Sequence, residues 1–262
     1  MKNKVVFPLT LLTIMTILAF ITPLFSNPFS INLEKRLSPP DSENILGTDE
    51  LGRDLFARLT YGSRISIELT LISLFFAIGL GGLLGGIAGY YGGFADFTIT
   101  KIIDVLLSLP GILLAIVIMT FFKRGELSLI FALTTTSWIS YARTSRTISA
   151  NLRETNFIES ARISGGGFYY IFKNHIFPNL FPLLSTQATV GAATIIMTES
   201  SLSFLGLGLL PPTPSIGGII SNGCDYLLES PHIIIFSSFY LLVLLWSLYR
   251  IADVLRESLY GE

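Results

Sequence analysis

Long uncharged apolar runs constrain this chain more than any other feature of its sequence. Its 262 residues are 51% hydrophobic and only 13% charged, whereas soluble domains carry about 25% charged residues. A bilayer crossing needs about 20 apolar residues in one helix. Six runs approach that length, at residues 5–25, 69–95, 105–122, 127–142, 180–198 and 233–249. The sequence therefore predicts an all-α polytopic membrane protein with about six transmembrane helices.

The first run and the positive charges predict how the chain is divided and oriented. Lys2 and Lys4 precede a run that is longer than a signal-peptide core, and no A-x-A cleavage site follows. We therefore expect residues 1–25 to be a retained N-terminal anchor helix. We expect residues 26–65 to be an extracytoplasmic segment with an amphipathic helix, residues 66–254 a transmembrane domain and residues 255–262 a cytoplasmic tail. Lys and Arg are more numerous on the side that holds both termini, which predicts that this side is cytoplasmic.

Composition and missing motifs argue against several functions. A net charge of −1 gives no bulk attraction to nucleic acid. One cysteine, Cys224, and two histidines, His175 and His232, leave no internal disulfide and little material for a metal cage. The chain lacks the G-x-x-x-x-G-K-[ST], H-E-x-x-H and G-x-S-x-G motifs. We therefore expect no catalytic site, no metal site and no cofactor in this chain.

A polar island, "NFIESARISGGGFYYIFKNHIFPN", interrupts the apolar runs at residues 156–179. Asn156 can cap a short helix, and Glu159 can reach back to it as in a capping box. The glycines at 165–167 would end that helix, and Pro178 would break a second one just before the next span. The pattern predicts a helix-turn-helix across the cytoplasmic mouth, although an ordinary capped turn remains an alternative.

A charged stretch at residues 46–66 predicts a helix on the outer surface. Leucines recur at every fourth position from residue 51, which gives the helix an apolar face. Asp49/Arg53 and Asp54/Arg58 have the i,i+4 spacing of ion pairs on its polar side. The pattern indicates an amphipathic helix that begins near Glu50. It is either a solvated cover for the bundle or a seat for another protein.

Two further patterns concern an irregular segment and helix packing. Prolines at 211, 212 and 214 preclude a regular helix, and irregular backbone at membrane depth needs protein or water around it. Residues 201–220 are therefore either a folded-in segment that lines a path through the bundle or a plain outer loop. Glycines at a spacing of four, at 81, 85, 89 and 93 and at 82 and 86, predict close helix packing. We expect the carboxylates of Asp104 and Glu199 to act as interface anchors.

The polar island resembles the EAA loop of bacterial ABC-importer permeases. Glu159, Ala161, Gly165 and Pro178 match that pattern in register, and "HIFPN" is similar to the form found in dipeptide, oligopeptide and nickel permeases. "LGTDELGRDLFARLTYGSRIS" resembles that family's outer signature, with alanine at 57 in place of serine. "SLSFLGLGLLPPTPSIGGII" resembles its later segment, with isoleucine at 216 in place of tryptophan. The resemblance covers roughly residues 45–255.

This resemblance implies a type I ABC importer transmembrane domain over residues 66–254. It implies a permease in a bacterial cytoplasmic (inner) membrane that imports a peptide or nickel. The partners would be a homologous second permease, two ABC ATPase subunits that bind ATP-Mg, and an extracytoplasmic binding protein. A secondary transporter, which should show an inverted repeat, and a membrane enzyme with clustered acids remain the rival hypotheses.

The resemblance also implies three groups of site residues. The ATPase-coupling loop would contain Glu159, Ser160, Ala161, Gly165, His175, Phe177 and Pro178. The extracytoplasmic signature would contain Gly47, Thr48, Asp49, Gly52, Arg53 and Asp54. Candidates for lining the path are Ser203, Phe204, Gly206, Gly208, Pro211 and Pro212.

Overall fold

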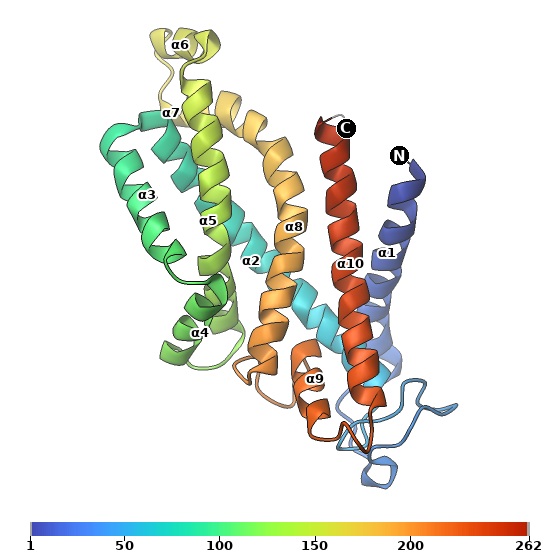
Figure 1. The fold of residues 1–262 in the computed structure, drawn as a ribbon. Helices are drawn as coiled ribbons and strands as arrows, with labels where there is room; N and C mark the ends of the chain where they lie inside the picture. Colours follow the sequence, from blue (N-terminus) through green and yellow to red (C-terminus); the bar gives the residue numbers. More distant parts are fainter. Residues whose placement is uncertain (1, 261–262) are drawn as a thin grey trace.

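The structure is a computed structural model that describes residues 2–260, and every named element in it is a helix. The long helices are α1 (Lys2–Phe25), α2 (Leu55–Tyr91), α5 (Glu126–Arg153), α8 (Phe177–Phe204) and α10 (His232–Tyr260). The shorter ones are η1 (Leu33–Lys35), α3 (Gly93–Leu107), α4 (Gly111–Phe121), α6 (Asn156–Ile163), α7 (Phe168–Ile171), the π-helical turn η2 (Phe172–Ile176) and α9 (Ile216–Cys224). Figure 1 shows a bundle with α6 at one end and α9 at the other, beside the segment before α2. We refer to these as the α6 end and the α9 end.

The expected polytopic architecture is confirmed. Four helical stretches are long and apolar enough to cross a membrane: Val6–Phe25, Leu55–Tyr91, Phe168–Phe204 and His232–Ser258. The α3–α4 pair passes the same test only as a broken span, bent by 89°. α5 has 28 residues and runs along the bundle, but it is rich in Ser and Thr. By this test the described chain has four spans, or five if the α3–α4 pair is one span, and α1 begins and α10 ends at the α6 end (Figure 1).

Two of the apolar runs are divided differently from the prediction. The run at 69–95 ends as a helix at Tyr91, because Gly92 adopts φ 67° and starts a new direction. The run at 105–122 is interrupted between α3 and α4, where Pro110 precedes the first residue of α4. Proline disfavours the helical conformation of the residue before it and donates no N–H. The run at residues 105–122 therefore forms part of a bent span instead of a straight helix.

Glycines let α2 and α5 pack backbone to backbone, as their spacing predicts. A Cβ built on Gly81, Gly85 or Gly89 would lie 2.5, 2.1 or 2.2 Å, in that order, from backbone oxygens of α5. Those distances are shorter than any real Cβ contact. The stripe ends at Gly89, because a Cβ on Gly93 would have no neighbour within 4 Å. Close approach of this kind is how helices associate in a bilayer.

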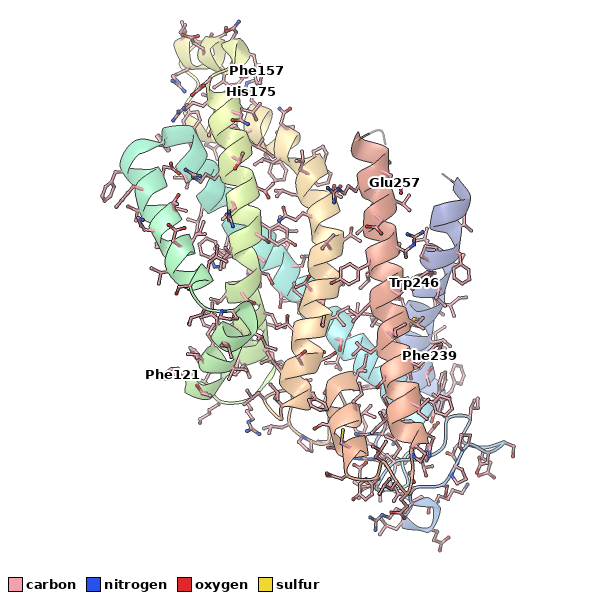
Figure 2. The ribbon with its side chains drawn as sticks, in the orientation of Figure 1. Phe121, Phe157, His175, Phe239, Trp246 and Glu257 are labelled. Carbon is pink, nitrogen blue, oxygen red and sulfur yellow. The ribbon has the colours of Figure 1, made fainter. Side chains whose placement is uncertain are left out.

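Apolar side chains cover much of the outside of the bundle. Phe75, Phe94, Phe121 and Phe239 are largely exposed, and Figure 2 shows the last two on opposite sides of the molecule. A soluble monomer rarely exposes so many large apolar groups together. These surfaces are suited to contact with lipid.

The amphipathic surface helix expected within residues 26–65 is not present. Residues 48–54 are non-helical, and α2 starts at Leu55 and continues without a break to Tyr91. Gly47 and Gly52 adopt φ values of 80° and 70°, which a helix cannot contain. The expected boundary between 65 and 66 therefore lies inside one helix. The expected tail at 255–262 is also helical as far as Tyr260, and residues 261–262 lie outside the described chain.

Candidate functional site

At the α6 end, α6 and α7 form a projection that is fixed to the bundle by apolar contacts. Ile158 of α6, Ile171 of α7 and Ile176 of η2 are fully buried in the cluster that also contains residues of α2 and α5. The ring of His175 lies between Phe157 and Tyr170, with ring centroids 5.9 Å from each. Figure 2 shows Phe157 and His175 together beneath the projecting helix. The projection is therefore a firmly seated part of the bundle.

The outer surface of this projection is exposed and partly apolar. Ile163 is 82% exposed and Tyr169 is 75% exposed. Glu159, Ser160 and Gly165 are exposed beside them. A small polar projection that carries large exposed apolar side chains is typical of a contact surface for another protein.

The glycine turn after α6 has the predicted form. Gly165 adopts φ 85°, and its N–H donates to the carbonyl of Arg162 at 3.0 Å. The N–H of Gly166 donates to the carbonyl of Ala161 at 2.9 Å. This pair of bonds is the Schellman motif that ends a helix with a left-handed residue. The main-chain oxygen of Ala161 is thereby satisfied within the turn.

The capping box predicted at the start of α6 is wrong. The N-cap is Thr155, Asn156 is already the first helical residue, and no side chain caps this helix. The hydroxyl of Thr155 instead donates to the carbonyl of Leu152 at 2.6 Å. Glu159 is exposed and takes no part in a cap, so its carboxylate is available at the surface.

The helix break predicted at Pro178 is also wrong. Proline lacks an N–H and its ring clashes with the carbonyl four residues earlier. The backbone accommodates Pro178 by widening into the π-helical turn η2. α8 follows directly, with Pro178 in its first turn. Phe177 and Pro178 are both exposed. The stretch Phe168–Phe204 is consequently one continuous helical rod that links the projection to the other end of the bundle.

At the α9 end, a buried carboxylate organises the segment before α2. Asp49 is 2% exposed, and its Oδ2 lies 2.7 Å from Arg53 Nε and 2.9 Å from Arg58 Nε. Its Oδ1 accepts from the backbone N–H groups of Leu51 and Arg53. The predicted Asp49/Arg53 pair is confirmed, but Asp54 does not pair with Arg58. Asp54 caps α2 by accepting from Phe56 N at 3.0 Å.

The same segment is tied closely to the chain around it. Cβ atoms on Gly47 and Gly52 would lie 2.6 and 1.7 Å from the backbone oxygens of Ser38 and Asn32. Thr48 is fully buried and accepts from Ser38 N at 2.9 Å. The predicted signature residues are therefore largely buried and structural, and they do not form the solvated helix face that their spacing suggested.

Exposed charges on the neighbouring loop keep their ordinary ionised forms. The pKa of Asp41 lies below its usual value because the backbone N–H groups of Asn44 and Glu43 donate to its carboxylate. The pKa of Lys35 lies above its usual value because its ammonium group pairs with Glu43. Both effects favour the charged states, so this loop stays charged at neutral pH.

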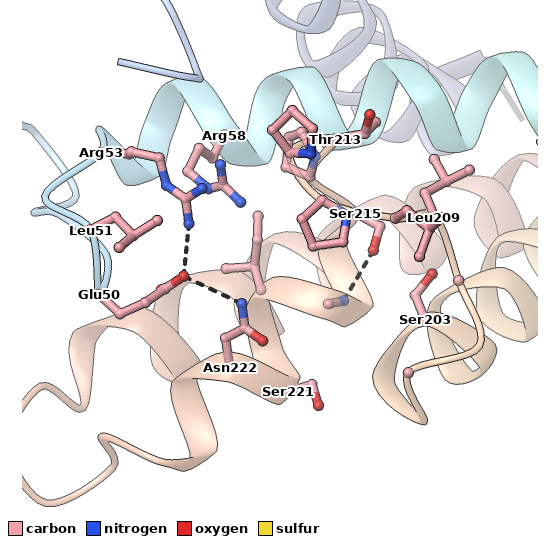
Figure 3. Close-up of a pocket in the computed structure, with 18 of the residues that line it drawn as sticks. Glu50, Leu51, Arg53, Arg58, Ser203, Leu209, Thr213, Ser215, Ser221 and Asn222 are labelled. Carbon is pink, nitrogen blue, oxygen red and sulfur yellow. Dashed lines mark hydrogen bonds and ion pairs between the residues drawn. The ribbon is translucent and has the colours of Figure 1, made fainter. Parts of the chain in front are cut away.

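An outer pocket of about 370 Å³ lies between this segment and the chain that connects α8 to α9 (Figure 3). Glu50 bridges its two walls, because Oε1 accepts from Arg53 Nη2 at 2.7 Å and from Asn222 Nδ2 at 3.4 Å. Arg58 and Arg124 also line it. Five of the six predicted path-lining residues border this pocket: Ser203, Gly206, Gly208, Pro211 and Pro212. Phe204 does not, and faces a separate apolar hollow beside Met197.

Glu199 has a different place from the one predicted. It is fully buried, and its carboxylate accepts hydrogen bonds from Ser66 at 2.8 Å, Ser203 at 2.9 Å and Ser200 at 3.4 Å. The expectation that it anchors the chain at the interface is therefore wrong. Asp104 is exposed, 3.7 Å from Lys101. The i,i+4 spacing of Glu199 and Ser203 was readable in the sequence, but the contact with α2 was not.

Comparison with known proteins places the chain in a family. Residues 81–259 match the family described as "Binding-protein-dependent transport system inner membrane component". The dipeptide transport system permease protein DppC of Alkalihalophilus pseudofirmus is 33% identical, over 98% of this chain and 86% of that protein. The glutathione transport system permease protein GsiD of Pectobacterium atrosepticum is 36% identical, over 84% and 73%. The nickel transport system permease protein NikC of Escherichia coli K12 is 30% identical, over 89% and 84%.

The fold agrees with this assignment. A chain of the MetNI methionine ABC transporter, solved in inward-facing conformations, superposes with a TM-score of 0.60 at 20% identity. The match covers 76% of this chain and 94% of that one. An ABC importer permease works in a complex with ATPase and binding-protein partners and has no ATPase site of its own. The chain therefore belongs to the family of binding-protein-dependent transport system inner membrane components, the permeases of ABC importers.

Proposed function

We propose that this permease forms half of a peptide translocation path, together with a homologous second permease. The relatives named for dipeptide, glutathione and peptide transport favour peptides as the substrate, and the relative named for nickel makes nickel the alternative. Two ABC ATPase subunits would supply the energy, and an extracytoplasmic binding protein would deliver the substrate.

The α6–α7 projection would be the docking surface for one ATPase subunit. The observation that carries this proposal is the contrast between its buried base and its exposed apolar tip, at Ile158 and Ile163. A base that is packed into the bundle can transmit force, and the exposed apolar side chains at the tip can be buried against a partner protein. Glu159 and Ser160 would lie at the edge of that contact, with Gly165 at its closest approach. Ala161, His175, Phe177 and Pro178 would hold the projection in position.

Coupling would follow from the helical rod that begins at α7. When the ATPase dimer closes on ATP, it would draw the projections of the two permeases together. Because α7, η2 and α8 are continuous, this motion would reach the α9 end and open the path outward. Hydrolysis would reset the path inward. The outer pocket, with its charged wall at Glu50 and Arg124, would lie at the mouth where the binding protein docks.

This mechanism requires the α6 end and both termini to be cytoplasmic. The excess of Lys and Arg on that side supports this orientation. The α9 end would then face outward, which puts the outer pocket on the side from which substrate arrives.

A substitution at the turn tests the docking proposal. Gly165 adopts φ 85° and a Cβ there would have no neighbour within 4 Å, so Gly165→Glu costs about 1–2 kcal/mol of backbone strain and clashes with nothing inside the permease. We expect normal amounts of Gly165→Glu in the membrane, with loss of both ATPase attachment and peptide uptake, measured by co-purification and transport. Gly165→Asn is the control, because Asn tolerates the left-handed conformation. If Gly165→Glu assembles and transports normally, the segment is only a capped turn.

A further inference from the structure

A middle cavity of about 430 Å³ lies within the bundle, between α4, α5 and α8. Its lining is rich in hydroxyl groups, from Thr136, Ser137 and Ser140 of α5 and from Thr194 and Thr198 of α8. Most of these hydroxyls donate to a carbonyl of their own helix, as Thr194 does to Val190 at 3.1 Å. They therefore offer oxygen lone pairs to the cavity. None of the described residues that line it is charged.

Tyr141 supplies a polar group at this cavity that the protein leaves without a partner. Its side chain is 1% exposed and lines the cavity, and its hydroxyl has no hydrogen bond within the described chain. Gly191 makes room for that hydroxyl, because a Cβ there would lie 2.0 Å from it. Leaving a buried polar group unsatisfied is costly. A buried hydroxyl without a partner in the protein is explained if a bound molecule hydrogen-bonds to it during function.

Gln187 supplies a second polar group at the middle cavity that has no partner within the described chain. It is half-buried on α8 and lines the middle cavity, and no other part of the described chain hydrogen-bonds to its amide. It also lines a second cavity, of about 960 Å³, toward the α6 end between α5, α8 and α10. The two cavities share Gln187 and Val190, so they adjoin along α8. Charged side chains line only the second cavity, at Asp253, Arg256 and Glu257.

The geometry points to a substrate-binding subsite at the middle cavity, in which Tyr141 and Gln187 bond to the backbone amides of a peptide in transit. This inference rests on the proposed function and adds the chemical class that the path accepts. Tyr141 can donate or accept, and the Gln187 amide offers both a donor and an acceptor. A peptide unit has the complementary N–H and C=O groups. Since the lining is uncharged, the subsite would treat peptides with acidic, basic and neutral side chains alike.

A metal ion suits this cavity poorly. Among the described residues, no group of three or more His, Cys, Asp and Glu could hold a metal ion. Hydroxyl and amide oxygens alone are weak ligands for nickel, which is better suited by imidazole nitrogens. Nickel is therefore the competing occupant in the test and is not part of the proposal.

The test removes each polar group with little change of shape. The complete importer, co-expressed with its partners and placed in liposomes, would carry Tyr141→Phe, Gln187→Leu or both. Tyr240→Phe is the matched control, because it removes the hydroxyl of a partly buried tyrosine that bonds to Ser63, away from the cavity. Uptake of radiolabelled trialanine would be measured beside ATP hydrolysis, thermal stability and uptake of nickel ions.

We expect Tyr141→Phe and Gln187→Leu each to slow trialanine uptake about two- to tenfold, the effect of one lost hydrogen bond. Stability should not fall for Tyr141→Phe, because the hydroxyl has no partner to lose. Peptides with acidic or basic side chains should be slowed by the same factor, and Tyr240→Phe should transport normally. A purely structural role would instead lower stability and uptake together.

Three results would overturn the inference. The first is wild-type peptide uptake in both variants, and the second is a matching loss of uptake in Tyr240→Phe. The third is an effect on nickel alone. A wild-type complex that hydrolyses ATP but accumulates neither peptide nor nickel would overturn the proposed function as well. The first two results leave the proposed function standing.

Discussion

At the scale of single residues, Gly85 decides how closely α2 and α5 can approach. A Cβ there would lie 2.1 Å from the backbone oxygen of Ala142, so Gly85→Ala must push the two helices apart. We expect Gly85→Ala to lower the free energy of unfolding by about 1–3 kcal/mol, measured by thermal denaturation in detergent. Gly79→Ala on the same helix is the control, because its Cβ would meet nothing within 4 Å. Equal effects of the two substitutions would contradict this account of the packing.

A second residue-scale prediction concerns Asp49. Asp49→Asn leaves Arg53 and Arg58 without their shared buried carboxylate, although Arg53 keeps Glu50. Breaking a buried ion pair by removing one partner costs about 3–5 kcal/mol. We expect Asp49→Asn to lower the unfolding temperature strongly, with the same thermal assay. Asp41→Asn should have little effect, since that side chain is exposed and its backbone contacts suit an amide oxygen equally well.

Residue spacing predicted contacts within or along one helix better than contacts between distant segments. The four-residue spacing of Gly81, Gly85 and Gly89 correctly predicted a packing face. In contrast, the bond from Ser66 to Glu199 joins residues 133 positions apart. Spacing along the chain reports only local neighbours, so the sequence alone does not reveal the contact between Glu199 and α2. Tyr141 was missed for the same reason, because its importance depends on Gly191 of another helix.

At the scale of elements, the short helix α6 carries one buried residue and one residue of the proposed docking surface. Ile158 is fully buried and Ile163 is 82% exposed, five positions later on the same helix. We expect Ile158→Ala to destabilise the permease by about 2–5 kcal/mol. Ile163→Ala should change stability by no more than about 0.5 kcal/mol, yet weaken ATPase attachment in a co-purification assay.

This pair of substitutions makes the two roles separable. If both variants lose stability alike, Ile163 is part of the fold and the projection has no free tip. If Ile163→Ala binds the ATPase as well as the unchanged permease does, the apolar tip is not the contact. Only stable protein with weakened attachment agrees with a docking surface at this element.

The long apolar helices were predictable from the sequence, but the effect of individual prolines was not. Pro110 and Pro178 both lie in helical runs, and only Pro110 separates two helices that bend apart. Pro178 is accommodated by the π-helical turn η2, whose Ile176 is buried against the core. Packing therefore decides between a break and a bulge, and packing is not visible in a single sequence. The surface helix predicted near Glu50 failed similarly, because Gly47 and Gly52 hold a tight non-helical turn.

At the scale of the whole molecule, the two ends of the bundle have different designs. The α6 end presents an apolar tip on a firmly packed base, whereas the α9 end presents a pocket with a charged wall. The rod from α7 through α8 connects them and also carries Gln187, which lines the two cavities along the way. A movement at one end therefore has a direct mechanical route past the proposed subsite. This arrangement is what alternating access requires of one subunit.

Cysteine labelling tests the orientation of the whole molecule. Cys224 is the only cysteine in the sequence and is exposed on α9, so an unmodified protein already carries a reporter at that end. Ser164 is exposed on the α6 projection, and Ser42 is exposed in the segment before α2. A charged maleimide cannot cross the bilayer and labels only residues on the outside of intact protoplasts.

With both termini cytoplasmic, native Cys224 should be labelled. In a Cys224→Ser background, Ser42→Cys should be labelled in intact protoplasts and Ser164→Cys only after permeabilisation. The Cys224→Ser protein alone is the unlabelled control. The reverse pattern would put the α6 projection outside the cell, where no ATPase could reach it, and both the orientation and the proposed coupling would fail together.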